Sequence, residues 1–473
     1  KAAVPQPRQG RQQHWEPRCT GPDQQQGQHA GAEQVRCAVV DFLVQGGADQ
    51  GAGHAPECQG AAVEARDGAL LVAGHAEAQG GAEAGTQDGA ADADDGQRGG
   101  DGGVLGRQPG HVGDPVARAG DHARAIELAQ AHLPADLAHT AHILQANAAI
   151  ARADEVAWQG HVNGYLASYG VAPIRLEGSG TLFERLGVDP LPLVTGGPLI
   201  SVIMPAWNAE KTVQKAAQSI LNQTWRNLEL LIVDDCSTDA TWSVLQKIAE
   251  ADDRVKILRN TANVGPYVSK NIALTQARGE WITGHDADDW AHPERLTNHR
   301  VAAQERTLEA SLAYMIRMQP SGHFGHIGAA TGFSLDGAAR KASISCLFKR
   351  SALDQKLGYW DSVRFGADSE MIARAEKALG DRFAILPHIS MICLDLETSL
   401  TNHPEHGVDK VKGISPVRAN YRDSWSAWLT NEAAAKPVFL PFPQQARRYA
   451  AADEMVVDNK NIMLNLESIH CEP

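Results

Sequence analysis

The sequence predicts an α/β fold whose core is a mixed, mainly parallel sheet flanked by helices. Apolar, strand-like runs alternate regularly with helical stretches between residues 199 and 304. Repeated βα units of this kind imply parallel strands joined by right-handed crossovers. Acidic or Gly-containing segments close these runs, and such a sheet collects ligand groups at the carboxyl ends of its parallel strands. We therefore expect one binding site along this edge.

The apolar runs predict the strands in chain order, and the amphipathic stretches between them predict the helices. Two helices begin with a proline, Pro266 and Pro293, which suits the first helical position because its missing N–H is not needed there. Beyond residue 305 the pattern is mixed. The expected strands are 199–204, 228–233, 255–258, 281–284, 312–318, 343–348, 383–386 and 390–394, and the expected helices are 210–222, 240–250, 266–277, 293–304 and 367–378.

The remaining chain divides into three segments around the α/β domain at 199–400. Residues 1–120 lack Ile, Ser, Asn, Tyr and Met, and hold 24 of the 45 glycines. Their few apolar side chains cannot offset the ordering entropy, so we expect a low-complexity arm, either disordered or translated from a wrong reading frame. Residues 121–198 predict a helical segment and a Pro- and Gly-rich linker. Residues 401–473 predict a helical and irregular extension.

Charge and cysteine content exclude several classes of protein. The formal net charge is −14 without a Lys/Arg cluster, which disfavours binding to nucleic acid. No apolar stretch approaches the ~18 residues that cross a bilayer, although peripheral membrane contact stays open. The seven cysteines are scattered and form no Cys-x-x-Cys pair. We therefore expect reduced thiols and a cytoplasmic location, which includes the inner face of the membrane.

An acidic pair closes the second apolar run, at Asp234 and Asp235. Carboxylates at a strand end can accept hydrogen bonds from a base N–H or a ribose hydroxyl. Capping of the next helix is the alternative, and we assign it to Asp239. Two adjacent acids are costly without a partner, which favours ligand binding for the pair. Trp207, after the first run, can stack on a base.

A second acidic motif, His285-Asp286-Ala287-Asp288-Asp289, ends the fourth apolar run. Alternate residues of an extended segment point the same way, so Asp286 and Asp288 can converge on one ligand. Hard oxygen donors suit Mg²⁺ or Mn²⁺, which also bind diphosphate oxygens. The alternative is a solvated acidic turn before the next helix.

Further candidates lie outside these motifs. Gly265 can allow close backbone approach, and Lys270 can face a phosphate or a base. Asp368 can serve as a general base or as a helix N-cap. His403 can be an additional metal ligand or an ordinary loop histidine.

Residues 199–400 resemble a bacterial family 2 glycosyltransferase of the GT-A fold. The match covers somewhat under half of the chain. The motifs that carry it are SVIMPAWN (201–208), SILNQT (219–224), VDDCSTD (233–239), NVG (263–265), GEWI (279–282), DADD (286–289) and PERL (293–296).

The resemblance implies a nucleotide-diphospho-sugar donor, most often a UDP-sugar, a Mn²⁺ or Mg²⁺ ion, inversion at the anomeric carbon, and a glycan or glycolipid acceptor. Asp368 falls where the family places its catalytic base, with Glu370 in reserve because Ala367 replaces the acid that usually precedes the base. Asp288, with Asp286 and His403, would hold the metal. The donor site would comprise Pro205, Ala206, Trp207, Asn208, Asp234, Asp235, Asn263, Gly265, Lys270, Asp286 and Ala287.

Other departures from the family pattern limit the inference. Cys236 stands where Gly is common, and Lys270 where Arg is frequent. Neither Gln-x-x-Arg-Trp nor membrane helices occur, which argues against a processive synthase and for transfer of a single sugar. Surface polysaccharide or glycoconjugate synthesis is the expected setting. A sugar-nucleotide nucleotidyltransferase and a non-catalytic binding protein with a vestigial site are the alternatives.

Overall fold

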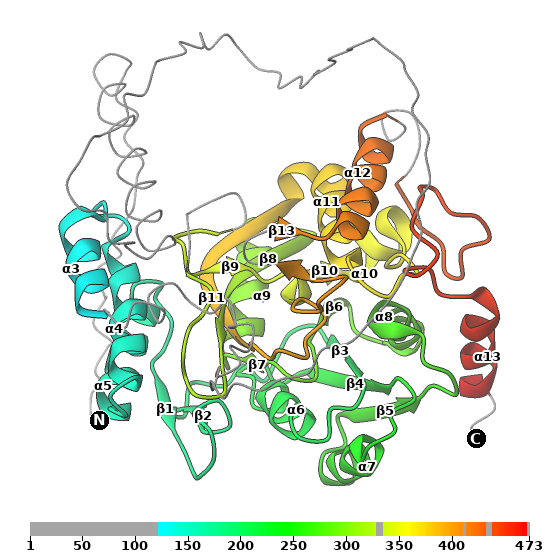
Figure 1. Cartoon of the computed structure of the whole chain (residues 1–473). Helices are drawn as coiled ribbons and strands as arrows, with labels where there is room; N and C mark the ends of the chain where they lie inside the picture. The colour runs from blue at the N-terminus through cyan, green and yellow to red at the C-terminus, as the bar shows by residue number, and fades with distance from the viewer. Residues whose placement is uncertain (1–121, 328–333, 410–412, 432–437, 471–473) are drawn as a thin grey trace, which may run out of the picture. The chain divides into compact units, whose positions relative to one another are not determined.

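The computed structural model describes residues 122–327, 334–409, 413–431 and 438–470. The expected arm at 1–120 therefore lies outside the described residues. The main feature of the described part is a nine-stranded mixed sheet, in the order β5-β4-β3-β6-β10-β8-β11-β7 with β9 beside β8. Its long pairings are parallel, and helices cover both of its faces (Figure 1). The expected fold class is confirmed.

The first half of the sheet is the parallel half. Every residue of β3 (Ile200–Ala206) and β4 (Leu228–Asp234) is buried, because helices pack on both sides. Ile200 and Val202 face one helical layer, and Ile203 faces the other. Figure 1 shows α8 on one side of these strands and α6 and α7 on the other. The further elements of this stretch of the chain are α6 (Val213–Leu221), α7 (Thr241–Ala251), β5 (Val255–Arg259), α8 (Gly265–Gln276), β6 (Trp281–Gly284), β7 (Trp290–Ala291) and α9 (Arg295–Glu305). Of these, β7 lies at the opposite edge of the sheet.

The second half of the sheet is mixed. Two expected strands at 383–386 and 390–394 are one strand, β11 (Phe383–Leu394), whose register against β8 (Ala310–Met318) shifts on both sides of Ile389. Pro387 lies in this stretch and has no N–H to donate to a neighbouring strand. The strand-like sequence pattern is therefore interrupted there, although the strand itself continues. The strand expected at 343–348 begins instead as a turn of 3₁₀-helix. The elements here are β9 (Arg340–Lys341), η2 (Ser343–Ser345), β10 (Leu347–Lys349), α10 (Arg350–Ala352) and η3 (Leu353–Leu357).

The helical segment before the α/β domain is part of its core. Helices α4 (Ala141–Ile150) and α5 (Glu155–Ala167) pack in one apolar cluster with residues of β8 and β11. The buried Asp336 carboxylate holds this segment in place as well, because it accepts hydrogen bonds from Tyr165 of α5 (2.8 Å) and from Tyr169 just after it (2.6 Å). The expected linker also contains a small hairpin. The remaining elements of this segment are α3 (His122–His132), η1 (Ala138–Thr140), β1 (Ile174–Leu176) and β2 (Leu186–Val188).

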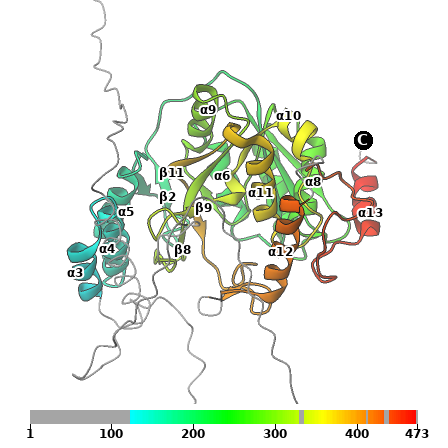
Figure 2. The ribbon, with the colours of Figure 1, turned by 90° about the horizontal axis from the view of Figure 1, so that it is seen from above.

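The C-terminal extension packs on the layer that contains α8. Helix α11 (Ala367–Leu379) contacts α12 (Pro416–Asn431), and Figure 2 shows the two side by side. Residues of 438–462 complete the same apolar cluster. No helix in the described part of the chain is long and apolar enough to span a membrane. The remaining elements are η4 (Gly380–Arg382), β12 (Val408–Asp409), β13 (Gly413–Ile414) and α13 (Asn459–His470).

Candidate active site

The parallel strands bring the acidic motifs to one edge of the sheet. Ala206 at the end of β3 is in register with Asp234 at the end of β4. The His285 amide, just beyond β6, donates to the Ile203 carbonyl at 3.0 Å. Both motifs therefore flank the end of β3, as expected for parallel neighbours. Pro205 and Ala206 form the buried end of β3 itself.

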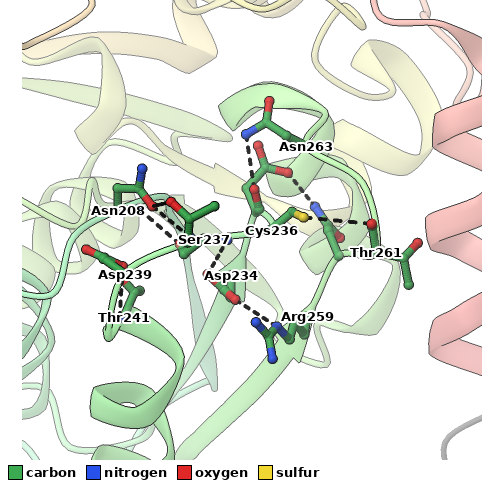
Figure 3. A network of polar contacts seen from close by, with 12 residues as sticks. Asn208, Asp234, Cys236, Ser237, Asp239, Thr241, Arg259, Thr261 and Asn263 are labelled. Atoms are coloured by element: carbon green, nitrogen blue, oxygen red, sulfur yellow. Dashed lines mark hydrogen bonds and ion pairs between the residues drawn. The ribbon is translucent and has the colours of Figure 1, made fainter.

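Asp234 and Asp235 are both buried and already bonded within the protein. Asp235 accepts hydrogen bonds from the backbone N–H groups of Val264 (3.0 Å) and Gly265 (2.7 Å), and so caps the start of α8 from another strand. Asp234 accepts from the Ser237 N–H and faces the Arg259 guanidinium at 3.1 Å (Figure 3). The two carboxylates thus organise the loops at this edge, and a role in holding a base or a ribose stays a prediction.

The loop after β3 presents one aromatic side chain. Trp207 is 59% exposed, an unusual state for tryptophan, and its ring is free for stacking. Asn208 has a φ of +47°, which asparagine tolerates better than most residues. Its amide oxygen accepts from the Thr238 N–H at 2.9 Å, and its own N–H donates to the Ser237 hydroxyl (Figure 3). Asn208 therefore joins the loops after β3 and β4 and holds Trp207 outward.

The backbone conformation at Cys236 explains why glycine is common at this position in the family. Its φ is +62°, a left-handed conformation that costs an L-residue about 1–2 kcal/mol. Glycine avoids this cost but loses about 0.5–1 kcal/mol through its greater freedom in the unfolded chain. We expect Cys236→Gly to raise the free energy of unfolding by roughly 0.5–1 kcal/mol, measured by urea denaturation. Cys236→Ala keeps the Cβ atom and should give no gain, so equal effects of the two substitutions would refute this explanation.

The loop after β6 concentrates three carboxylates. Removal from water raises the pKa of Asp286 and, together with the neighbouring Asp286 charge, raises the pKa of Asp288 to about 6. Asp289 is buried, and its Oδ1 accepts the Leu394 N–H at 3.1 Å. Asp288 has no hydrogen bond to another described residue. Ala287, between Asp286 and Asp288, is buried.

These residues fit a divalent cation. Asp286 and Asp288 supply oxygen donors. A bound cation would compensate the negative charges that the surrounding residues leave only partly balanced. Among the described residues, no group of three or more His, Cys, Asp or Glu side chains is arranged to hold a metal. Mg²⁺ is commonly held by one or two carboxylates together with water and substrate phosphates, so two donors are sufficient.

Lys270 joins the acidic loop to the candidate base. Its side chain is only 1% exposed, and its Nζ lies 3.7 Å from Asp286 and 3.4 Å from Asp368. Tyr267, one helical turn earlier on α8, donates its hydroxyl to the other Asp368 oxygen at 3.1 Å. Burial raises the pKa of Tyr267 well above its usual value, so this hydroxyl stays a donor. The Asp368 side chain remains 24% exposed and can be reached from outside.

Three other expected site residues are not brought to this cluster. Glu370 is fully buried and is held by Arg374 through two hydrogen bonds of 2.9 and 2.8 Å. Asn263 bonds the Asp235 carbonyl and accepts from Arg364. His403 stacks on His406, and its Nδ1 accepts from neighbouring backbone N–H groups. None of the three has a contact with Asp286 or Asp288 among the described residues, and their expected roles stay predictions.

Sequence reasoning missed three residues near the cluster. Tyr267 carried a usable signal, because a residue three positions before Lys270 lies on the same helical face. Arg418 on α12 stacks on Phe365, and burial lowers its pKa against the opposing effects of nearby Tyr267 and Asp368. Burial raises the pKa values of Asp286 and Asp288, and the positive charge of Arg317 on β8 opposes that rise. Both arginines come from distant segments and carry no local motif.

The comparison with known families addresses the domain that contains this cluster. Residues 201–353 match the family model described as glycosyl transferase family 2. This chain carries a family 2 glycosyltransferase domain. The domain has the GT-A type of fold, and the expected resemblance is confirmed. The matched residues include all the strand-end motifs, whereas Asp368 lies beyond them.

Bacterial relatives match shorter stretches of the glycosyltransferase domain. The putative teichuronic acid biosynthesis glycosyltransferase TuaG of Bacillus subtilis is 33% identical over 154 residues, which is 32% of this chain and 60% of that protein. The UDP-Glc:α-D-GlcNAc-diphosphoundecaprenol β-1,3-glucosyltransferase WfaP of Escherichia coli is 36% identical over 100 residues, 21% of this chain and 39% of that protein. The crystal structure of S. aureus TarS 1–349 with UDP-GlcNAc is 22% identical, with a TM-score of 0.36, and covers 42% and 59% of the two chains. The chain thus spans less than two thirds of each.

Proposed function

We propose that this protein is an inverting, metal-dependent glycosyltransferase of bacterial surface polysaccharide or glycoconjugate synthesis. It moves one sugar from a nucleotide-diphospho-sugar, with a UDP-sugar favoured, to a hydroxyl of a glycan or glycolipid acceptor. The observation that carries the proposal is the position of buried Lys270 between Asp286 and Asp368. Asp368 therefore lies near the acidic loop that follows β6, which supports its role as the base in a single transfer step. The proposed location is the cytoplasm, including the inner membrane face.

Asp368 is the base in this proposal. The acceptor hydroxyl gives its proton to an Asp368 oxygen while its own oxygen bonds to the anomeric carbon. The bond from that carbon to the diphosphate oxygen breaks, and the electron pair leaves with the nucleoside diphosphate. Tyr267 and Lys270 hold the carboxylate in place through one oxygen each. Inversion follows because a single base serves a single in-line displacement.

The donor contacts follow from exposure and charge. Trp207 stacks on the base, since its ring is the exposed aromatic surface at the strand ends. Lys270 faces the sugar or phosphate side, next to Asp286. Asp288, with Asp286, would hold Mn²⁺ or Mg²⁺. Such a cation, when bound, neutralises charge that develops on the departing diphosphate.

A donor screen with the full chain tests this proposal. Release of nucleoside diphosphate is followed from UDP-, GDP- and dTDP-sugars, with Mn²⁺ and with chelator. We expect slow hydrolysis of one donor, abolished by chelator and reduced about 100-fold or more by Asp288→Ala. Asp253→Ala, at an exposed acid after α7, is the matched control and should retain full turnover.

The screen also decides between the alternatives. Turnover that survives both chelator and Asp288→Ala would refute the metal-dependent mechanism. No turnover, together with no thermal stabilisation by any donor with metal, would favour a non-catalytic binding protein with a vestigial site. Release of pyrophosphate from a nucleoside triphosphate and a sugar phosphate would instead identify a nucleotidyltransferase.

A further inference from the structure

Two arginines lie on neighbouring strands of the sheet without a hydrogen-bond or ion-pair partner in the described part of the chain. Arg317 is on β8, and Arg340 is on β9. The strands are antiparallel, and Arg340 is in register with Met315, two residues from Arg317. Residues two apart in a strand share a face, so the two guanidiniums lie diagonally on one face. Each is partly buried. Burial lowers the pKa of Arg340, and the charge of the neighbouring Arg317 lowers it further.

Neither guanidinium has a hydrogen bond or ion pair with any residue that the structure describes. The Nε atoms of Arg317 and Arg340 are both buried without an acceptor. The acid that would serve them, Asp395, is already bonded to His326 (3.1 Å) and Asn402 (3.1 Å). Two like charges so placed repel each other, and desolvated donors without acceptors cost stability. A bound anion would relieve both costs.

The pair adjoins the candidate metal site. Arg317 is in register with Cys393 on β11, and the next residue, Leu394, donates its N–H to Asp289 of the acidic loop. Arg317 also acts electrostatically on Asp286 and Asp288. The two arginines and the acidic loop thus lie at neighbouring places on the sheet, joined through Leu394 of β11. Their place suits an anionic group of a molecule that also reaches the acidic loop.

We propose that Arg317 and Arg340 form a subsite for a phosphoryl group of a substrate of this enzyme. Guanidinium groups bind phosphate through two parallel hydrogen bonds, and a phosphoryl group carries enough charge and oxygen atoms to serve two of them. A carboxylate carries a single charge and matches the pair less well. The phosphoryl group belongs either to the nucleotide-diphospho-sugar or to a phosphate-linked acceptor. This inference rests on the proposed function for the identity of the substrate, but not for the binding of phosphate.

The test is binding of inorganic pyrophosphate to the full chain, in EDTA, by isothermal titration calorimetry. Chelator keeps the acidic loop from recruiting pyrophosphate through a metal. We expect Arg340→Gln to weaken binding roughly tenfold to a hundredfold, the loss typical of a charged hydrogen bond. Arg382→Gln is the matched control, because Arg382 is 50% exposed and paired with Glu309, and it should bind as the unmodified chain does.

A second variant and a kinetic arm complete the test. Arg340→Lys keeps the positive charge but loses the planar guanidinium that forms two parallel hydrogen bonds, and it should bind pyrophosphate with intermediate affinity. It also serves if Arg340→Gln does not fold. A raised KM for the donor in hydrolysis assigns the phosphoryl group to the nucleotide-sugar, and a raised KM only for a phosphate-bearing acceptor assigns it to the acceptor.

The outcomes separate this proposal from the enzyme activity. Pyrophosphate binding needs no turnover, so an inactive protein that binds it through Arg340 would still support the subsite. No binding to the unmodified chain, or equal affinity in the unmodified chain, Arg317→Gln and Arg340→Gln, would overturn it.

Discussion

Asp368→Asn should lower kcat for sugar transfer by about 10²–10⁴-fold while leaving the KM for the donor nearly unchanged. The substitution keeps the shape of the side chain but removes the atom that takes the acceptor proton. Lys270 can still donate to the amide oxygen, and the amide N–H can donate to the Tyr267 hydroxyl, so local structure should survive. The measurement is steady-state transfer with the donor that the screen identifies, together with thermal unfolding of both proteins.

The control for this substitution lies at the other end of the same helix. Asp381 is exposed in η4, and the length of α11 separates it from Asp368, so Asp381→Asn should transfer sugar normally. Wild-type kcat in Asp368→Asn would remove the base from the mechanism. A rise in donor KM without a change in kcat would instead show that Asp368 binds the donor.

The sheet could be predicted from the sequence because burial on both faces leaves a plain signal. In β3 and β4 every residue is buried, so both strands are largely apolar runs, and the acids Asp234 and Asp235 close the second. The parallel arrangement places those acids at one edge of the sheet. The sequence alone could therefore predict that Asp286 lies close to the other strand-end loops. The short strands β1, β2 and β7, of two or three residues, are too brief to carry a pattern.

The inner structure of the site depends on contacts that the sequence does not contain. Asp234 and Asp235 have the same local pattern as ligand-binding acids, yet both are buried and bonded to neighbouring loops. Arg317 and Arg418 reach the site from strands and helices that are distant in the chain. Glu370 is different, because helical geometry could have excluded it: residues two apart on a helix point about 200° apart. If Asp368 faces the site, Glu370 faces away.

Glu370→Gln should therefore cost stability, not chemistry. Glu370 and Arg374 are one turn apart on α11, both with no exposed side-chain surface, and form a salt bridge at 2.8 Å. Arg374 also donates to the carbonyls of Leu357 and Tyr359, so it cannot leave the core when its partner is lost. An uncompensated buried charge costs about 3–5 kcal/mol of unfolding free energy, and we expect a loss of that size in urea denaturation. Glu376→Gln, on the exposed face of the same helix, should change the value by less than about 0.5 kcal/mol.

The same variant decides which of the two acids is the base. Glu370 has no exposed side-chain surface, whereas Asp368 is partly exposed, so no acceptor hydroxyl can reach Glu370 in the folded protein. We expect Glu370→Gln to keep its kcat per folded molecule when it is assayed well below its unfolding midpoint. Unchanged stability together with abolished transfer would reverse the assignment, since it would mean that Glu370 leaves Arg374 to take the acceptor proton. The two readouts are independent, because one reports the charge left in the core and the other reports proton transfer at the sheet edge.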